Sequence, residues 1–298
     1  MRQGKLYATA VFCILTVLFA QVFSSDALTH EGTEPSGITV LIIGGTARTA
    51  NDLIPQALWR GHNVVALARR PYRVRHAPHP RLKVVKGDVY DKASIEAALS
   101  GDGSEVVISL YGGRQDPSIP TPITDIYSQG TTNIIEAMKA KGNMRLVVTT
   151  SMAAPHVAER YTNESTELVD ERIWLFNLRG PYLDMLKMEE IVKVSGLDYI
   201  IWRPGQLIIE PARGDLKLAV DDEPVPSRRV VTYADSAAWI LDQVESDDFL
   251  YKTVSTFSDI KMSDMEGMDF ESAVANRRAA KAEADADLAR DAAAAAKD

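Results

Sequence analysis

A pair of glycines, Gly44 and Gly45, ends an apolar run in a way that suits the binding of a phosphate group. The run over 38–43 is rich in β-branched residues, and a helical pattern over 50–59 follows the glycines at once. A strand, a tight glycine turn and a helix together aim free backbone N–H groups at an anion. The turn therefore predicts a site for the phosphates of a nucleotide cofactor.

The spacing of small residues in this turn follows the dinucleotide-binding pattern with one departure. The pattern needs small residues at three points, which here are Gly44, Ala47 and Ala50. Alanine is tolerated at the third point, where it only lets helix and strand approach closely. At the second point, the methyl group of Ala47 lies where the backbone meets the pyrophosphate. The alternative interpretation is an ordinary β–α turn that binds no cofactor. The residues at the end of the next strand help to decide between these interpretations.

Two arginines stand where the second strand is expected to end. The apolar run over 63–68 is followed by Arg69 and Arg70, at the point where an NAD enzyme usually places an acid. An acid accepts a hydrogen bond from the ribose 2′-hydroxyl, whereas arginine suits a 2′-phosphate. With Arg48 the two arginines make a small basic pocket, and we predict NADP(H) in preference to NAD(H).

Composition excludes several classes of site and partner. The chain has 298 residues, of which 46% are hydrophobic and 25% charged, as is typical of a globular protein. Its net charge of −8 argues against nucleic-acid binding, which normally needs a basic face. The single cysteine, Cys13, allows no internal disulfide, and the five histidines show no metal-ligand spacing. We therefore predict no metal site and no nucleic-acid partner.

The N-terminus is predicted to be separate from the fold. Arg2 and Lys5 precede an apolar run over 6–23, and small residues follow it. This order is typical of a secretory signal peptide, with cleavage after Ser24 or Ala27. An uncleaved membrane anchor is the alternative, because the run is about as long as the shortest bilayer span. The same run is the only segment predicted to associate with a membrane.

These signals set the predicted compartment. If 1–27 is a cleaved signal peptide, the chain resides in the endoplasmic reticulum lumen or in an organelle reached through it. If 1–27 is an anchor, the protein is held at a membrane. Asn163 begins a glycosylation sequon that could be used in the secretory lumen. Residues 28–37 are predicted to be a linker.

From residue 38 the chain alternates short apolar runs with helical patterns. Strands are predicted over 38–43, 63–68, 82–86, 105–110, 144–150 and 198–202. Helices are predicted over 48–60, 91–100, 122–141 and 182–195, with Asp91 as a helix N-cap. The alternation predicts an α/β fold, a doubly wound parallel sheet of the Rossmann type. Such sheets bind ligands outside the carboxyl ends of their strands, so the site is expected there.

The pattern changes after about residue 206. Short strands over 216–220 and 228–232, a helix over 233–245 and a strand over 252–257 predict a small C-terminal substrate lobe. The Rossmann domain with this lobe is thus expected to span 38–258. Residues 259–298 lose apolar content and become rich in alanine and charge, which predicts a solvated low-complexity tail.

Four motifs, taken in order, give a resemblance to a known family. They are Gly44-Gly45-Thr46, Gly87-Asp88-Val89, Thr149-Thr150-Ser151 and the run 195–205 that ends in Arg203-Pro204-Gly205. Together they resemble the atypical short-chain dehydrogenase/reductase family, in the NAD(P)H-binding group with flavin reductase/biliverdin reductase B-like and NmrA-like members. The resemblance covers residues 38–257. It is specific for the fold and says little about the substrate.

The resemblance implies a cofactor role for each matched position. The pyrophosphate would be held by Gly44, Gly45, Thr46, Ala47, Arg48 and Thr49. Arg69, with Arg70, would hold the 2′-phosphate, while Asp88 meets the adenine amino group and Val89 packs on the ring. The ribose and nicotinamide would be lined by Leu110, Tyr111, Gly112 and Gly113. The nicotinamide pocket would also include Ser151, Pro204 and Gly205.

The candidate catalytic residues depart from the usual pair of this superfamily. Its better-known members use Tyr-x-x-x-Lys, whose two residues lie four apart on one helical face. Here the nearest pair is Tyr182 and Lys187, five apart and roughly 140° round a helix, unless Tyr182 lies before the first turn. The flavin/biliverdin reductase type also lacks this tyrosine and takes its proton from solvent or a serine hydroxyl. The resemblance therefore implies Ser151, Lys187 and Tyr182 as candidates, with Ser151 fitting best.

Two functions of different classes follow from these expectations. The first is a reductase in which NADPH transfers hydride to a planar conjugated acceptor such as a flavin, tetrapyrrole or quinone, mainly by orienting the two. The second is a non-catalytic NADP(H)-binding sensor or assembly protein of the NmrA-like type, which the missing Tyr-x-x-x-Lys and the polar tail fit. A nucleotide-sugar epimerase would need a proper tyrosine–lysine pair and ranks below both.

Overall fold

The computed structural model describes residues 34–76, 78–101, 105–112, 124–143, 145–160 and 179–261, together with Asp264 and Ala286. The predicted signal peptide or anchor, Gly113, the Asn163 sequon and most of the C-terminal tail lie outside these residues. All described residues except Glu34 belong to one compact unit, Pro35–Asp298. No helix among the described residues has the length and hydrophobicity needed to cross a bilayer.

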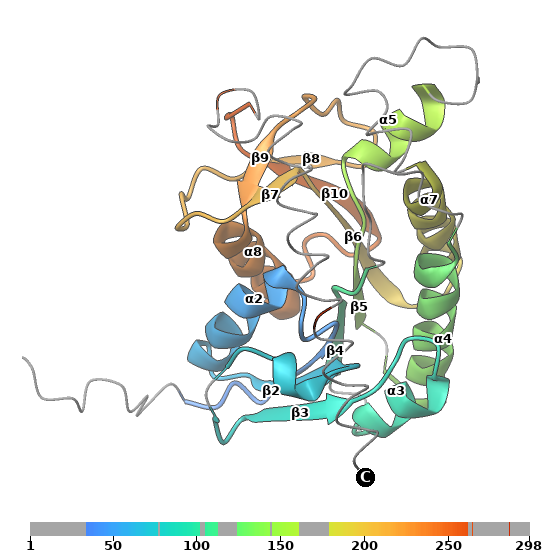
Figure 1. The fold of residues 1–298 in the computed structure, drawn as a ribbon, viewed down its shortest axis with the longest axis vertical. Helices are drawn as coiled ribbons and strands as arrows, with labels where there is room; N and C mark the ends of the chain where they lie inside the picture. Colours follow the sequence, from blue (N-terminus) through green and yellow to red (C-terminus); the bar gives the residue numbers. More distant parts are fainter. Residues whose placement is uncertain are drawn as a thin grey trace, which may run out of the picture. The chain divides into compact units, whose positions relative to one another are not determined.

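A central sheet of eight strands organises this unit (Figure 1). Its strands are β1 Thr39–Ile43, β2 Asn63–Ala68, β3 Leu82–Lys86, β4 Glu105–Ser109, β5 Arg145–Thr149, β6 Asp198–Pro204, β8 Lys217–Val220 and β10 Lys252–Phe257. Their order is β3-β2-β1-β4-β5-β6-β10-β8. All neighbours pair in parallel except β8, which is antiparallel to β10. The predicted doubly wound parallel sheet is confirmed.

The period-two alternation of strand side chains divides the core into two halves. In β1, Val40 and Ile42 point into one hydrophobic cluster, while Leu41 and Ile43 point into the other. All four are fully buried. Strands that are buried on both faces read as continuous apolar runs, which is why β1 was recognisable in the sequence.

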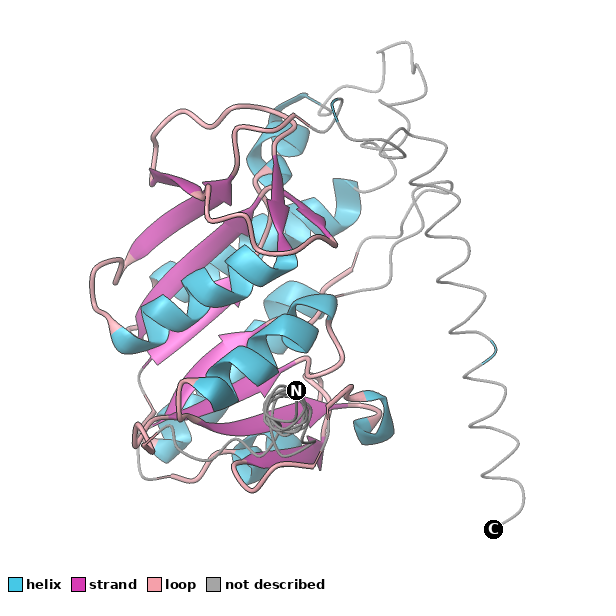
Figure 2. Ribbon diagram, turned by 90° about the vertical axis from the view of Figure 1, so that its left-hand side faces the viewer, coloured by secondary structure: helices cyan, strands magenta, loops and turns pink. Residues whose placement is uncertain are grey.

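Helices cover both faces of the sheet (Figure 1). One face packs against α2 Arg48–Trp59 and α8 Tyr233–Glu245, which contact each other and lie in front of the strands in Figure 2. The other face packs against α3 Lys92–Ala98, α4 Ile126–Lys141 and α7 Arg179–Lys193. A further helix, α5 Ala153–Arg160, contacts α7. Every helix expected from the sequence is present.

The ends of two helices are held by carboxylates, one local and one distant. The predicted N-cap Asp91 is confirmed, because its side chain accepts a hydrogen bond from Ser94 N at 3.3 Å. Helix α4 takes its cap from another helix. Asp184 of α7 is 5% exposed and accepts from Tyr127 N at 2.8 Å and Ser128 N at 3.3 Å. The buried carboxylate thereby satisfies N–H groups in the first turn of α4 and favours its helix dipole.

We expect Asp184→Ala to lower the free energy of unfolding by about 2–3 kcal/mol, because two buried N–H groups lose their acceptor. Urea denaturation of both proteins measures this loss. Glu190→Ala serves as the matched control, since Glu190 is an exposed carboxylate on the same helix. Its loss is expected to stay within about 0.5 kcal/mol. Equal small losses in the two variants would contradict the capping role.

Several element boundaries differ from the sequence prediction. Helix α7 begins at Arg179, three residues early, because Pro181 is accommodated in a first helical turn. Helix α5, the 3-10 turn η2 Pro71–Arg73 and the strand β7 Gln206–Ile208 were not predicted. η2 and β7 have three residues each and are too short to show a hydrophobic period.

The segment after residue 206 takes part in two sheets. Strands β8 and β10 extend the central sheet beyond β6. The three-residue strand β7 pairs in parallel with β9 Val230–Thr232 in a separate two-stranded sheet. Asp235, at the start of α8, accepts from the backbone of Arg213 and Gly214 and so fixes the loop that follows β7.

Candidate functional site

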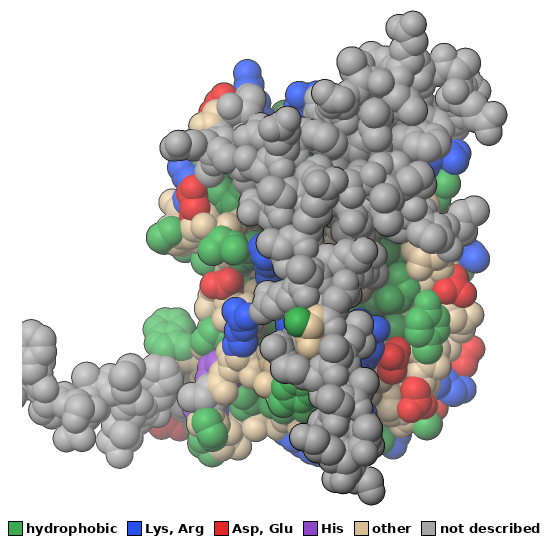
Figure 3. Space-filling model, in the orientation of Figure 1, with side chains coloured by type: hydrophobic (Ala, Val, Ile, Leu, Met, Phe, Trp, Pro, Cys, Tyr) green, Lys and Arg blue, Asp and Glu red, His purple; other side chains and the backbone are tan. Residues whose placement is uncertain are grey.

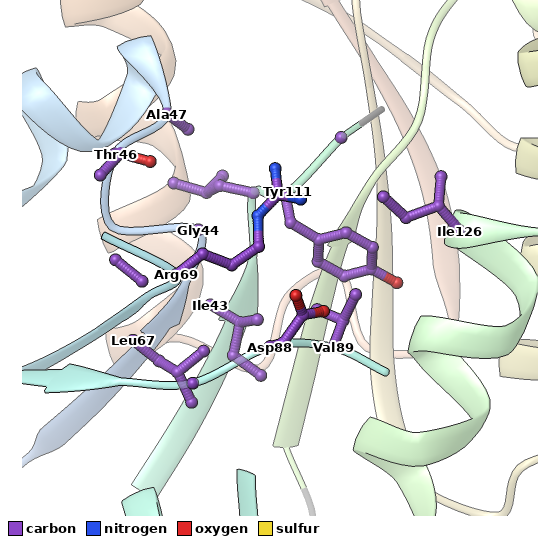
Figure 4. A pocket seen from close by; sticks show the side chains of 14 residues that line it. Ile43, Gly44, Thr46, Ala47, Leu67, Arg69, Asp88, Val89, Tyr111 and Ile126 are labelled. Carbon is purple, nitrogen blue, oxygen red and sulfur yellow. The ribbon is translucent and has the colours of Figure 1, made fainter. Parts of the chain in front are cut away.

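A pocket of about 220 Å³ opens at the carboxyl ends of the first four strands (Figure 4). Its lining comprises Ile43, Gly44, Thr46, Ala47, Leu67, Ala68, Arg69, Gly87, Asp88, Val89, Leu110, Tyr111, Gly112 and Ile126. β1 lies between β2 and β4 in the sheet, so the strand order reverses here. This is the topological switch point at which open α/β sheets bind their ligands.

Gly44 holds the turn in a conformation that only glycine adopts freely. Its φ is +101°, and a Cβ atom there would lie 2.7 Å from Tyr111 N. Gly44 N and Gly45 N both donate to Leu67 O at 3.0 Å. These two N–H groups therefore bind β1 to the end of β2 and are not available to a phosphate. The glycines shape the pocket by letting two backbones approach.

The N–H groups that can meet an anion belong to the start of α2. Arg48 and Thr49 have no carbonyl one turn back within the helix, as for any first turn. Ala47 is the N-cap residue, with an ordinary extended backbone (φ −64°, ψ 151°) and no side-chain cap. Its departure from glycine therefore costs no backbone strain. A helix start with an uncapped first turn is a ready site for a phosphate.

The two arginines after β2 differ in position. Arg69 is exposed, lines the pocket and extends its side chain across it toward Tyr111 in Figure 4. Arg70 is half-buried and is not part of the lining. Arg48 is exposed and Thr49 is buried, and neither side chain lines the pocket. Arg69 is thus the arginine of the pair that lines the pocket.

Asp88 and Val89 follow β3 and lie side by side in the pocket (Figure 4). One carboxylate oxygen of Asp88 accepts from Tyr90 N at 3.0 Å, and Asp88 N donates to Ser94 Oγ at 3.1 Å. The loop is thereby fixed by its own side chains. Gly87 is needed before it, since a Cβ atom there would lie 2.9 Å from both Leu67 and Ser94. The sequence motif Gly-Asp-Val is therefore assembled as expected.

Tyr111 forms one wall of the pocket and is tied to α4. Its hydroxyl donates to Tyr127 O at 3.1 Å or to Thr131 Oγ1 at 2.9 Å, and its ring stacks on that of Tyr127. Burial raises the pKa of Tyr111 above its usual range. Gly130 leaves room for the hydroxyl, because a Cβ atom there would lie 2.7 Å from it. Tyr111 is therefore a fixed wall whose hydroxyl is held by α4.

Three predicted residues at the other half of the sheet do not line this pocket. Ser151 follows β5, and its Oγ accepts from Ala153 N at 3.2 Å at the start of α5. Pro204 ends β6, and its carbonyl accepts from Met152 N at 3.1 Å. Gly205 N donates to Thr256 O at 2.9 Å. The Met152–Pro204 bond holds the ends of β5 and β6 together at the edge where ligands bind such sheets.

The structure does not assemble a tyrosine–lysine pair. Helix α7 begins at Arg179, so Tyr182 and Lys187 both lie within it, five residues apart. Tyr182 is buried in the hydrophobic core, whereas Lys187 is exposed. Neither side chain lines the pocket. The exception that the sequence left open, with Tyr182 ahead of the first turn, does not occur.

Some residues of this region had no signal in the sequence. Ile126, at the start of α4, lines the pocket although it follows β4 by more than fifteen residues. Glu189 is 1% exposed and pairs with Arg203, whose Nε lies 2.9 Å from Glu189 Oε1. This buried ion pair joins α7 to the end of β6. No group of three metal-ligating side chains occurs among the residues described.

Comparison with known proteins identifies the family of this chain. A family model described as NAD(P)H-binding matches residues 44–247. An uncharacterized chloroplastic protein of Arabidopsis thaliana is 28% identical over 186 residues, 61% of this chain and 64% of that protein. A 3-diazoavenalumate denitrifying reductase of a Streptomyces species is 29% identical over 177 residues, 56% of each protein. The chain thus spans less than two thirds of the length of these curated relatives.

Solved structures share the fold. An anaerobillin reductase from Escherichia coli O157:H7 has a TM-score of 0.56 and 21% identity, covering 75% of this chain and 98% of that one. A short-chain dehydrogenase/reductase from Veillonella parvula, solved with NADP, has a TM-score of 0.56 and 17% identity, covering 75% and 96%. At these identities the likeness concerns the fold alone. The family match over 44–247, on a Rossmann sheet with its pocket at the switch point, shows that this chain belongs to the NAD(P)H-binding family.

Proposed function

We propose that the protein binds NADPH in preference to NADH and transfers its hydride to a planar conjugated acceptor. The observation that carries the proposal is one pocket in which Arg69 and Asp88 meet the uncapped start of α2. An uncapped helix start suits a pyrophosphate, and a guanidinium suits a 2′-phosphate better than a ribose hydroxyl. An NAD site would place an acid where Arg69 stands.

The lining suits the adenine, phosphate and ribose parts of the cofactor. Thr46 and Ala47 border the helix start, where the pyrophosphate would lie. Val89 offers an apolar surface for the adenine ring, beside the carboxylate of Asp88. Leu110 and Tyr111 would continue the wall toward the ribose and nicotinamide. When bound, NADPH would supply the hydride, and these residues would orient it.

The acceptor half of the site favours catalysis by orientation. The hydroxyl of Tyr111 is bound to α4, and on α7 Tyr182 is buried whereas Lys187 is exposed. A reductase without a tyrosine–lysine pair needs an acceptor that takes hydride readily, such as a flavin, tetrapyrrole or quinone. The proton would then come from solvent or from the Ser151 hydroxyl, whose Oγ already accepts a backbone bond. The 3-diazoavenalumate denitrifying reductase among the relatives supports this class of reaction.

A non-catalytic NADP(H)-binding protein is the second candidate. The observation that favours it is the absence of an assembled tyrosine–lysine pair on α7 within the described chain. Such a protein would bind the cofactor to sense its redox state or to stabilise an assembly, and it would not oxidise NADPH.

A single experiment distinguishes the reductase from the non-catalytic binding protein. The purified full-length chain is titrated with NADPH and then with NADH, and binding is followed by the fluorescence of the reduced nicotinamide. Flavin mononucleotide and a quinone are then added, and absorbance reports oxidation of the coenzyme. We expect tighter binding of NADPH than of NADH, followed by oxidation. Tight binding without oxidation would favour the sensor, and binding of neither nucleotide would exclude both candidates.

A further inference from the structure

The segment that runs from the end of β2 through β3 to the pocket carries a high concentration of positive charge. Residues 69–86 hold seven basic residues (Arg69, Arg70, Arg73, Arg75, Arg81, Lys83 and Lys86) and no acidic one. The whole chain has a net charge of −8, so the remainder is more acidic still. Only Arg69 of this group lines the pocket. The other six basic residues do not line the pocket, so contact with a bound ligand does not explain them.

We propose that Arg75, Lys83 and Lys86 form an electrostatic funnel that draws the anionic end of NADPH to the pocket. This inference rests on the proposed function. The three side chains are exposed, and none has a carboxylate partner within the part of the chain that the structure describes. Unpaired charges project a field into solvent, whereas paired ones largely cancel.

The positions of the three residues follow the approach to the pocket. Lys86 is the last residue of β3 and directly precedes Gly87, which lines the pocket. Lys83 lies three residues back, about 10 Å along the strand, and the alternation of strand side chains puts it on the opposite face of the sheet from Lys86. Arg75 follows η2, which contacts β3. At low ionic strength these distances are within the reach of an unscreened charge.

Acidic side chains near the pocket oppose the approach of a polyanion from their side. On the face shown in Figure 3, acidic side chains lie at the lower right, where Figure 1 places α3 and α4. The N-cap residues of these two helices, Asp91 and Asp125, are exposed. A ligand with a 2′-phosphate carries about 1.5–2 more negative charges than one without it. The basic segment therefore favours approach from the β3 side, and it favours NADPH over NADH before any contact forms.

The same lysines have a second explanation, which the experiment tests. β3 is an edge strand, and lysines on edge strands prevent pairing with another chain. If the lysines only prevent pairing of the edge strand, their removal leaves the association rate of the cofactor unchanged. The funnel requires a faster association that salt weakens, with no change in dissociation.

Stopped-flow fluorescence of the full-length chain with NADPH and NADH measures both rates. We expect the triple variant Arg75→Gln/Lys83→Gln/Lys86→Gln to bind NADPH about tenfold more slowly at 10 mM ionic strength, with less than about a twofold difference at 0.5 M. Dissociation should be unchanged. The association rate of NADH should fall less than that of NADPH.

A control variant separates local field from net charge. Lys139→Gln/Lys193→Gln/Lys217→Gln removes the same net charge from exposed positions at the far ends of α4 and α7 and on the opposite edge strand, β8. Lys193 pairs with Glu190 and Lys217 with Asp259, so this variant tests net charge alone. We expect it to associate with NADPH at nearly the rate of the unmodified chain. The salt dependence of the unmodified chain gives an independent reading if the triple variant fails to fold.

Two results would overturn the funnel, and they differ. If the unmodified chain binds NADPH at a rate independent of salt, or if both triple variants bind equally fast, the funnel is wrong while the proposed cofactor stands. If the unmodified chain binds no NADPH, the funnel and the proposed function fail together.

Discussion

Arg69→Ala is expected to raise the dissociation constant for NADPH about 10- to 100-fold and to leave that for NADH within about twofold. A charge-assisted hydrogen bond to a phosphate contributes about 1.5–3 kcal/mol, which corresponds to that range of affinity. Arg69 is the arginine of its pair that lines the pocket, so Arg70 does not replace it. Fluorescence titration with each nucleotide measures the two constants.

Two further variants refine this result. Arg69→Lys keeps the charge and loses the planar fork, so it is expected to recover only part of the affinity for NADPH. Lys139→Ala removes a charge from the exposed, distant end of α4 and should leave both constants unchanged. A parallel loss of NADPH and NADH binding in Arg69→Ala would contradict a contact with the 2′-phosphate and would indicate damage to the pocket.

The sheet was predictable because its information is local. β1 and β2 are runs buried on both faces, and the turn between β1 and α2 needs a glycine that the sequence displays. Asp88 and Val89 were predictable for the same reason, since they follow a strand directly. Parallel strands bring all such ends to one edge of the sheet.

The features that escaped prediction depend on residues far apart in the chain. The N–H groups of Gly44 and Gly45 were expected to face a phosphate, but they bond to Leu67 O on the next strand. Asp184 caps a helix that begins 58 residues earlier at Ile126. The spacing of residues in the sequence does not predict such hydrogen bonds. Each group has many possible partners, and the tertiary packing determines which one lies close enough to bond.

The catalytic candidates show the same limit within one helix. From the sequence, a shared role for Tyr182 and Lys187 required Tyr182 to lie before the first turn of the helix. In the structure Pro181 lies within the first turn of α7, where a proline meets no steric conflict, so Tyr182 is already helical. A shift of a few residues in the start of a helix thus decides whether two side chains can meet.

Gly44→Ala is expected to abolish binding of both nucleotides and to lower the free energy of unfolding by about 2–4 kcal/mol. Two effects add at this position. Alanine is strained at a φ of +101°, and its Cβ would lie 2.7 Å from Tyr111 N and 3.0 Å from Leu110 C, which are backbone atoms that cannot rotate away. The collision would separate β1 from β4 where the pocket opens. Urea denaturation and nucleotide titration measure the two losses.

Gly37→Ala is the matched control for this prediction. Gly37 also has a positive φ, +78°, but a Cβ atom there has nothing within 4 Å. It therefore carries the backbone strain without the collision, and about 1 kcal/mol of lost stability with unchanged nucleotide binding is expected. The difference between the two variants isolates the close approach of the β1 and β4 ends. If Gly44→Ala lost no more stability than Gly37→Ala and still bound NADPH, the contact between those strand ends would not be what shapes the pocket.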